Sequence, residues 1–209
     1  MFRRLAVLFV MAAVSGCAQD LPDSARVPHF TGKPATEVAV GITDHRSFIL
    51  DSDKEEWFEG ITRGSFGIPM SLQRPGDEGE KPFALYLSGM IKESLEKAGS
   101  QVTVVELEKG QNFQRAIAKV SESGKTSFVL LMLKSRYDIG FTSDYQHHFL
   151  VAVADADGRV KVEKTFFDWE KEIPASNKYN VFDMHTEIYK MTLDKIINDP
   201  EIKLALSGE

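Results

Sequence analysis

Ser127–Leu133, with the sequence Ser-Phe-Val-Leu-Leu-Met-Leu, decides the fold, because it is the most apolar run of the chain after residue 17. A short continuous apolar run is typical of a strand that is buried on both faces. After Leu133 the pattern alternates, with Lys134, Arg136 and Asp138 separated by less polar residues. We therefore predict a central strand whose far end projects beyond the helices that cover it and has one wet face.

A β-hairpin follows this strand. Gln146–Ala154 and Arg159–Trp169 both contain many β-branched and aromatic residues, which favour strands. Asp155–Gly158 joins them and ends in Asp-Gly, a pair that suits the positive φ of a tight turn. The pattern predicts two antiparallel strands next to the central one.

Helices and further strands complete one predicted domain. Phe83–Ala98 has apolar residues at helical spacing, Pro82 suits its first residue, and Gly99 suits its C-terminal stop. The other predicted elements are the strands Glu37–Ile42 and Gln101–Leu107, the helix Asn112–Ser121, and a last helix that is capped by Asn180 and ends before Pro200. The order β-α-β-α-β-β-β-α predicts an α+β fold, with a mixed β-sheet and helices packed mainly on one face.

The first seventeen residues have the layout of a lipoprotein signal. A basic start is followed by the apolar run Leu5–Val14 and by Val14-Ser15-Gly16-Cys17, which looks like a bacterial lipobox. A membrane anchor is the alternative, but the apolar run has ten residues and a spanning helix needs roughly twenty. Cys17 is the single cysteine, so an exported chain could form no internal disulfide, and lipidation explains its presence better than plain secretion.

These features predict three segments: a signal peptide at residues 1–16, a lipidated tether at 17–36 that contains Pro22, Pro28 and Pro34, and a single periplasmic α+β domain at 37–209. Removal of the signal peptide leaves 23 Lys and Arg against 31 Asp and Glu, a net charge of −8. An acidic chain of this kind argues against nucleic acid as a partner. In Gram-negative lipoproteins, which the start resembles, Asp after the cysteine retains the protein in the inner membrane. Ala18 therefore predicts the periplasmic face of the outer membrane.

Thr43–Glu80 lacks helical periodicity, and an irregular segment of this length is often functional. Its aromatic residues can bury area, so we predict a β-ribbon or a packed irregular excursion. The candidate binding residues are its polar and aromatic groups, Asp44, Arg46, Trp57, Arg63 and Phe66. The alternative is that the arginines pair with local carboxylates and pin the loop, while the aromatic residues pack beneath it.

Motifs for catalysis or metal binding are weak. Gly124-Lys125-Thr126 resembles the end of a phosphate-binding loop. However, Lys119 occupies the position where that loop needs an earlier glycine, and a predicted strand follows where the loop should open a helix. His147 and His148 are neighbours on a predicted strand, so their side chains point to opposite faces and cannot share a metal. We assign no catalytic residue, no metal ligand and no cofactor, and an enzyme is the less favoured reading.

Two motifs carry a family resemblance. The first strand ends in Ile42-Thr43-Asp44-His45-Arg46, and Gly60–Pro69 has the form Gly-x-x-Arg-Gly-x-Phe-Gly-x-Pro. With the lipobox and the proline-containing tether, they make the chain resemble the uncharacterised proteobacterial outer-membrane lipoproteins of the YajG-like kind. The resemblance implies an envelope lipoprotein without an established activity. The element order is also similar to periplasmic domains of lipoproteins that activate synthases or assemble secretion channels, which is an analogy of fold alone.

Three functions are compatible with these observations. We favour a lipid-anchored, non-catalytic binding or assembly module that contacts an envelope protein. The second is a hydrolase or small-ligand binder that acts on envelope material through carboxylates in a cleft beside Asp44–Pro69. The third is an auxiliary subunit of an envelope transporter.

Overall fold

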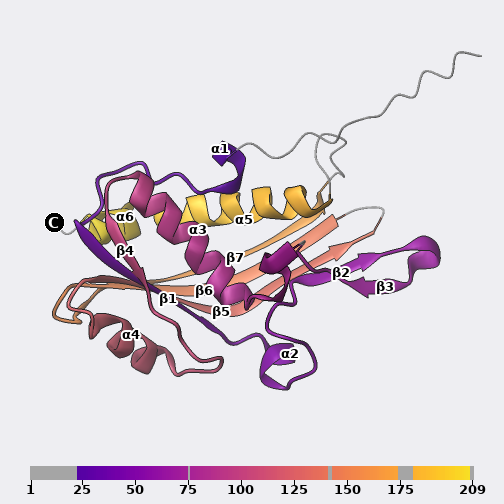
Figure 1. Cartoon of the computed structure of the whole chain (residues 1–209), viewed down its shortest axis with the longest axis horizontal. Helices are drawn as coiled ribbons and strands as arrows, with labels where there is room; N and C mark the ends of the chain where they lie inside the picture. The colour runs from indigo at the N-terminus through magenta and orange to yellow at the C-terminus, as the bar shows by residue number, and fades with distance from the viewer. Residues whose placement is uncertain (1–22, 75, 141–142, 174–180, 208–209) are drawn as a thin grey trace, which may run out of the picture.

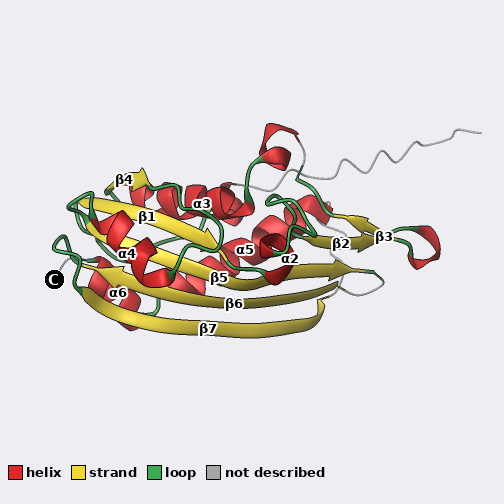
Figure 2. Cartoon of the chain, turned by 90° about the horizontal axis from the view of Figure 1, so that it is seen from below, coloured by secondary structure: helices red, strands yellow, loops and turns green. Residues whose placement is uncertain are grey.

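The computed structural model describes residues 23–74, 76–140, 143–173 and 181–207. The predicted signal peptide, Cys17 and the cap Asn180 lie outside these ranges. The described part of the chain forms one curved mixed sheet with helices on both faces (Figures 1 and 2). No described helix has the length and apolarity that crossing a bilayer requires.

Strand β5 (Thr126–Ile139) lies at the centre of the sheet. One of its edges pairs antiparallel with β6 (Ser143–Ala154), and β6 pairs antiparallel with β7 (Val160–Ile173). Its other edge pairs in parallel with β1 (Glu37–Asp44) and, further along, with β2 (Gly60–Arg63). The outer strands are β3 (Pro69–Ser71), antiparallel to β2, and β4 (Gln101–Val104), parallel to β1.

The helices divide the core into two layers. Helices α3 (Phe83–Lys97), α5 (Val181–Ile197) and α6 (Pro200–Leu206) cover one face, over a large apolar cluster that includes Val40, Leu130 and Ile196. Helix α4 (Phe113–Ser121) covers β1 and β5 on the other face and is drawn in front of the sheet in Figure 2. The predicted fold class and element order are confirmed, and most helices do lie on one face.

The structure differs from several predicted boundaries. Pro82 is the N-cap of α3 and not its first residue, and β4 ends at Val104 because the chain then turns toward α4. Pro200 does more than follow a helix: it begins α6, where the Asp199 side chain accepts hydrogen bonds from the amides of Glu201 and Ile202. Proline is well suited to this first helical turn.

The predicted tether is shorter than residues 17–36. After the short helix α1 (Asp23–Arg26), residues 29–31 form a clip on α5: the His29 amide donates to Asp194 and the Thr31 amide to Asn198. The Phe30 side chain between them is 3% exposed and belongs to the main core. An apolar side chain and paired backbone groups hold this segment on the domain, so residues 29–36 are corrected from tether to domain.

Thr43–Glu80 is a packed excursion that ends in a β-ribbon. It contains the short helix α2 (Ser47–Leu50), then β2, the 3-10 turn η1 (Ser65–Gly67) and β3. A second 3-10 segment, η2 (Gly76–Glu80), leads toward α3. In Figure 1 the β2–β3 ribbon projects from one end of the sheet.

Candidate functional site

Asp44 and Arg46 form a buried ion pair at the end of β1. The Arg46 guanidinium is fully buried and donates from Nε to Asp44 Oδ1 at 3.0 Å and from Nη2 to Asp44 Oδ2 at 2.7 Å. It also donates to the backbone oxygen of Phe58 and lies about midway between two aromatic rings, with its carbon 5.2 Å from the ring centroid of Phe48 and 5.1 Å from that of Phe83. Neither residue is a surface binding group, and both are corrected to pins of the loop, because a charge at this depth needs a partner.

Trp57 is half-buried, whereas its neighbour Phe58 is buried and packs edge-to-face against Phe48 at 5.4 Å. The backbone of this stretch is tied to the start of α3, where the Phe83 amide donates to Glu56 O at 2.9 Å. Phe58 is therefore an apolar anchor of the excursion, together with the buried Ile49 and Leu72.

Arg63 belongs to the β2–β3 ribbon and pairs with Asp138 of β5. Its guanidinium makes a bidentate contact, with Nε 2.9 Å from Oδ1 and Nη2 2.7 Å from Oδ2. This hydrogen bonding lowers the pKa of the Asp138 carboxyl. Gly60 permits the approach of the two strands, because a Cβ atom there would collide with the backbone of Tyr137. The first half of the Gly60–Pro69 motif thus attaches the ribbon to the sheet.

The second half of the motif forms an apolar tip. Phe66 is 101% exposed, and Ile68 and Met70 are exposed beside it. Phe66 has φ 65° and ψ 17°, a left-handed conformation that is uncommon for a bulky residue and costs roughly 1–2 kcal/mol. A phenylalanine that is both strained and fully solvated gains nothing from folding in the isolated chain. Strain of this kind gathers at functional sites.

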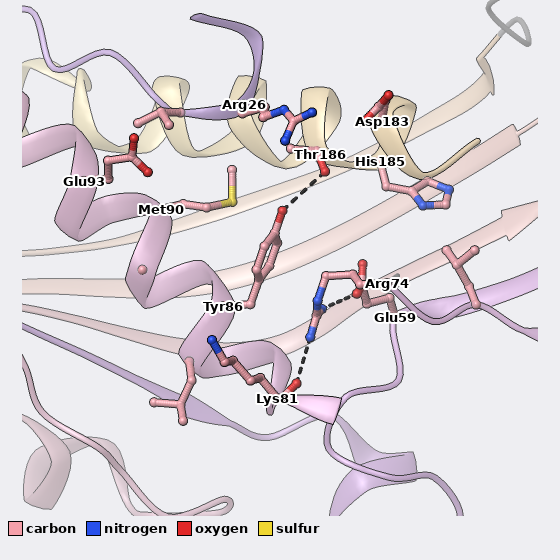
Figure 3. A pocket seen from close by; sticks show the side chains of 14 residues that line it. Arg26, Glu59, Arg74, Lys81, Tyr86, Met90, Glu93, Asp183, His185 and Thr186 are labelled. Carbon is pink, nitrogen blue, oxygen red and sulfur yellow. Dashed lines mark hydrogen bonds and ion pairs between the residues drawn. The ribbon is translucent and has the colours of Figure 1, made fainter. Parts of the chain in front are cut away.

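A cavity of about 530 Å³ lies beside the base of the ribbon, between α3 and α5 (Figure 3). The residues of its wall come from elements that are far apart in the sequence, including Arg26 of α1, Glu59 before β2, Tyr86 of α3 and His185 of α5. Leu72, Leu85 and Met90 add apolar surface. The cleft that one sequence hypothesis required beside Asp44–Pro69 therefore exists in the described part of the chain.

Glu59 and Arg74 form the polar floor of this cavity. Glu59 is buried, with one carboxylate oxygen bonded to Arg74 and the other accepting a hydrogen bond from the Tyr189 hydroxyl at 2.7 Å. Burial raises the pKa of Glu59, and the positive charge of Arg74 opposes this rise. The Arg74 guanidinium lies over the ring of Tyr86, with 4.4 Å between its carbon and the ring centroid, and donates to Lys81 O at 2.7 Å.

His185 lines the same cavity and is 3% exposed. Its Nε2 has no hydrogen-bond partner among the described residues, and its ring lies against Tyr137 at 4.4 Å between centroids. Burial lowers the pKa of His185 to about 3, so the ring is neutral at physiological pH. A neutral and buried imidazole is poorly suited to act as a general acid.

The described ranges contain no cluster of three or more His, Cys, Asp or Glu side chains that could bind a metal ion. His147 and His148 do point to opposite faces: His147 is buried on the helix-covered face beside Tyr145, and His148 contacts Phe167 on the other. Gly124-Lys125-Thr126 is the turn between α4 and β5, and the Lys125 ammonium donates to Thr103.

Comparison with known proteins assigns this chain to no family. No protein-family model matches the chain, and no curated protein does. Among solved structures, a Xanthomonas campestris protein of the family DUF330 has a TM-score of 0.45 at 12% identity, covering 87% of this chain and 89% of that one. A PelC dodecamer from Paraburkholderia phytofirmans has a TM-score of 0.40 at 9% identity, covering 80% and 91%. An uncharacterised protein scores 0.37 at 8% identity, covering 82% and 99%. At these scores the resemblance to YajG-like lipoproteins stays a prediction.

Sequence reasoning allowed for a cleft beside Asp44–Pro69 but did not identify the residues that line it. Of its candidate residues, Asp44 and Arg46 hold the excursion from inside, Trp57 is half-buried, and only Arg63 and Phe66 come together on the ribbon. Glu59 lies within the segment that the sequence marked, but its partners Arg74 and Tyr189 are 15 and 130 residues away. The arrangement can bind, since it offers an exposed apolar tip and a cavity with apolar and polar walls.

Proposed function

We propose that this chain is a lipoprotein of the bacterial envelope, anchored through Cys17 to the periplasmic face of the outer membrane, and that it acts as a non-catalytic binding or assembly module. The partner is an envelope protein with an apolar groove that accepts the tip of the β2–β3 ribbon. The lipobox and the residue Ala18 support the location.

The exposed, strained Phe66 carries the proposal. Free in water, its side chain contributes no burial, and its left-handed backbone has a cost. Inserted into a groove, a phenylalanine side chain can contribute about 1.5–3 kcal/mol from burial alone. The bidentate Arg63–Asp138 pair holds the ribbon and reduces the conformational freedom that binding would otherwise have to remove.

The short tether limits where that partner can lie. Five residues separate Cys17 from Asp23, and the six residue steps between them reach about 20 Å when extended. The partner of a domain held this close is itself a membrane protein or lies against the membrane.

The anchor is tested by intact-mass analysis of the protein purified from membranes. We expect a mass that begins at Cys17 and includes acyl chains, and a Cys17→Ala variant that is released in the soluble fraction. An unmodified Cys17 in membrane-derived protein would overturn the proposed anchor.

The ribbon is tested by photocrosslinking in intact cells, with a photoreactive amino acid at position 66. Leu204 of α6 is 58% exposed and serves as the matched control position. We expect a discrete crosslinked protein from position 66 that is absent from position 204 and is lost when Ile68→Asp is added. Equal crosslinking from both positions, or none from position 66, would contradict the proposal.

The cavity supports a second candidate function, the binding of a small amphipathic ligand. Its volume lies in the range of small-molecule sites, and it combines apolar walls with His185. Gly89 lines it on α3, and an added Cβ meets nothing within 4 Å. Native mass spectrometry should find a co-purifying small molecule in the natural chain and in Gly89→Ala, and none in Gly89→Phe, which fills the cavity. A natural chain that carries no co-purifying small molecule would argue against this function.

A further inference from the structure

Strand β7 is an open edge of the sheet. Within the described ranges its single neighbour is β6, and in Figure 2 it runs along the outer border with no described element beyond it. The strand is long, and its pairing with β6 has no register shift from Val162 to Glu170. An edge of this kind offers unpaired backbone N–H and C=O groups to another strand.

Two aromatic side chains stand on this edge. Phe167 is 67% exposed, and Trp169 is also exposed. They point to the face on which α4 covers β1, β5 and, at Ala152 and Ala154, part of β6, and their exposure shows that no described helix packs over them. The strand carries three lysines and four carboxylates, a near balance that does not repel a strand of the same composition.

We propose that β7 pairs antiparallel with β7 of a second copy of this chain, about a two-fold axis at Phe167, and so joins two sheets into one. In such pairing, residues directly opposite each other point to the same face. The two residue numbers of each opposing pair must therefore be both odd or both even. With the axis at Phe167, each opposing pair sums to 334.

This register makes the strand complementary to itself. Glu163 lies opposite Lys171 of the other copy, and Lys164 lies opposite Glu170. The two-fold axis repeats both pairs. Lys164 already pairs with Asp199 and Glu201 of its own chain, and Glu170 with Lys195, so the Glu163–Lys171 pair carries the complementarity. Glu163 is exposed and has no ion-pair partner in the described part of its own chain, while the Lys171 ammonium lies 3.7 Å from the Trp169 ring centroid, on the face that Glu163 shares.

The neighbouring registers are worse. An axis at Phe166 places Lys161 opposite Lys171 twice, and an axis at Asp168 places that carboxylate against its own copy. Like charges directly opposite each other destabilise a sheet. The axis at Phe167 has neither defect.

The same register also covers the aromatic residues. Phe167 meets Phe167 of the second copy, and Trp169 lies opposite Thr165. The row Thr165, Phe167 and Trp169 from both copies then forms one cluster on the open face. Aromatic cross-strand pairs of this type contribute to sheet stability.

A disulfide trap tests the register. The full chain carries Cys17→Ala, so that an introduced cysteine is the only thiol. Opposing Cα atoms in a sheet are about 4.5–5.5 Å apart, which suits a disulfide. We expect Phe167→Cys to form a covalent dimer under mild oxidation, whereas Thr165→Cys or Trp169→Cys alone does not. Leu204→Cys is the control for random collision. Dimer yield at position 167 no greater than at position 204 would overturn the proposal.

Charge reversal tests the same contact without cysteines. Sedimentation of the full chain should show a concentration-dependent dimer, which Glu163→Lys or Lys171→Glu weakens about tenfold and the double reversal restores. Reversal of the exposed α3 pair, Glu93→Lys with Lys97→Glu, should leave the dimer unchanged. A monomer at all concentrations, or a double reversal as weak as the single ones, would refute the pairing.

Discussion

The buried Arg46 gives the sharpest test of how the excursion after β1 is held. We consider Arg46→Met, which keeps a long apolar stem between Phe48 and Phe83 but removes every donor of the guanidinium. Among the described residues, the Asp44 carboxylate, which is 3% exposed, then keeps only the backbone amide of residue 46 as a donor, and Phe58 O loses its Arg46 donor. Breaking a buried pair from one side costs about 3–5 kcal/mol, roughly a fifth or more of a typical domain stability.

The measurement is urea unfolding of the full chain, followed by tryptophan fluorescence because Trp57 lies in the excursion. The double variant Asp44→Asn with Arg46→Met removes the stranded charge, so it should cost only about 1–3 kcal/mol for the remaining unpaired groups. Arg63→Met breaks a solvent-exposed pair and should cost about 0–1 kcal/mol. A loss for Arg46→Met as small as that for Arg63→Met, or a double variant no more stable than the single one, would refute the reasoning.

Three further predictions follow from buried and exposed positions. Burial lowers the pKa of His147 to about 4 and that of His185 to about 3, whereas histidines in the unfolded chain have a pKa near 6.5. Below about pH 6.5 the unfolded chain therefore binds more protons than the folded one, and the free energy of unfolding should fall by roughly 1.4 kcal/mol per pH unit for each residue. Urea titrations between pH 7 and 5 should show a flatter slope for the variant with His147→Phe and His185→Phe. Gly89→Ala should raise the free energy of unfolding by about 0.5–1 kcal/mol, since Gly89 is an exposed helical glycine with open space around its Cβ, and an unchanged or lower melting temperature would contradict this. Phe30→Ala should lower the free energy of unfolding by about 3–5 kcal/mol and make residues 23–36 accessible to protease, because the Phe30 side chain is buried. Lys33 is exposed, so Lys33→Ala should change that free energy by no more than about 0.5 kcal/mol. Equal effects of the two variants would mean that the segment is a free tether.

The central sheet could be predicted because its signals are local. The apolar run Ser127–Leu133 lies in β5, and the Asp-Gly turn before Arg159 joins β6 to β7. The alternation after Leu133 does mark an end of β5 with one wet face. The prediction that this end projects beyond the helices is wrong, because α5 covers its other face at Tyr137. Each of these features depends on residues within a few positions of one another, so the strand period and the turn chemistry are sufficient to recognise them.

The site could be predicted only in part, because its contacts join distant segments. Arg63 and Phe66 share one motif, and both stand on the ribbon. Glu59, Arg74 and Tyr189 come into contact only when α5 packs across the sheet, and no spacing in the sequence predicts this contact. Arg46 was recognised as a notable residue, but whether an arginine faces water or a buried carboxylate depends on the tertiary fold.

The prolines before β1 misled for a related reason. They do exclude a long helix, and residues 27–36 are indeed irregular, with Pro34 buried. An irregular segment can still be fixed when its side chains and amides find partners, as Phe30 does in the core and Thr31 does on Asn198. Amino-acid composition therefore indicates the backbone conformation of a segment, but it does not indicate whether that segment packs against the domain.

The clip formed by residues 29–31 also determines how the protein bears mechanical load. A pull on the chain before Asp23 reaches α5 first, through the bonds from His29 to Asp194 and from Thr31 to Asn198, before it reaches β1. These bonds lie near the C-terminal end of α5, and the Ala35 amide adds a bond to Leu206 O of α6. In the proposed anchored protein, tension would therefore detach the clip from the last two helices and lengthen the tether by about a dozen residues, while the parallel pairing of β1 with β5 stays intact. Under strain the domain could move further from its point of attachment without unfolding its sheet.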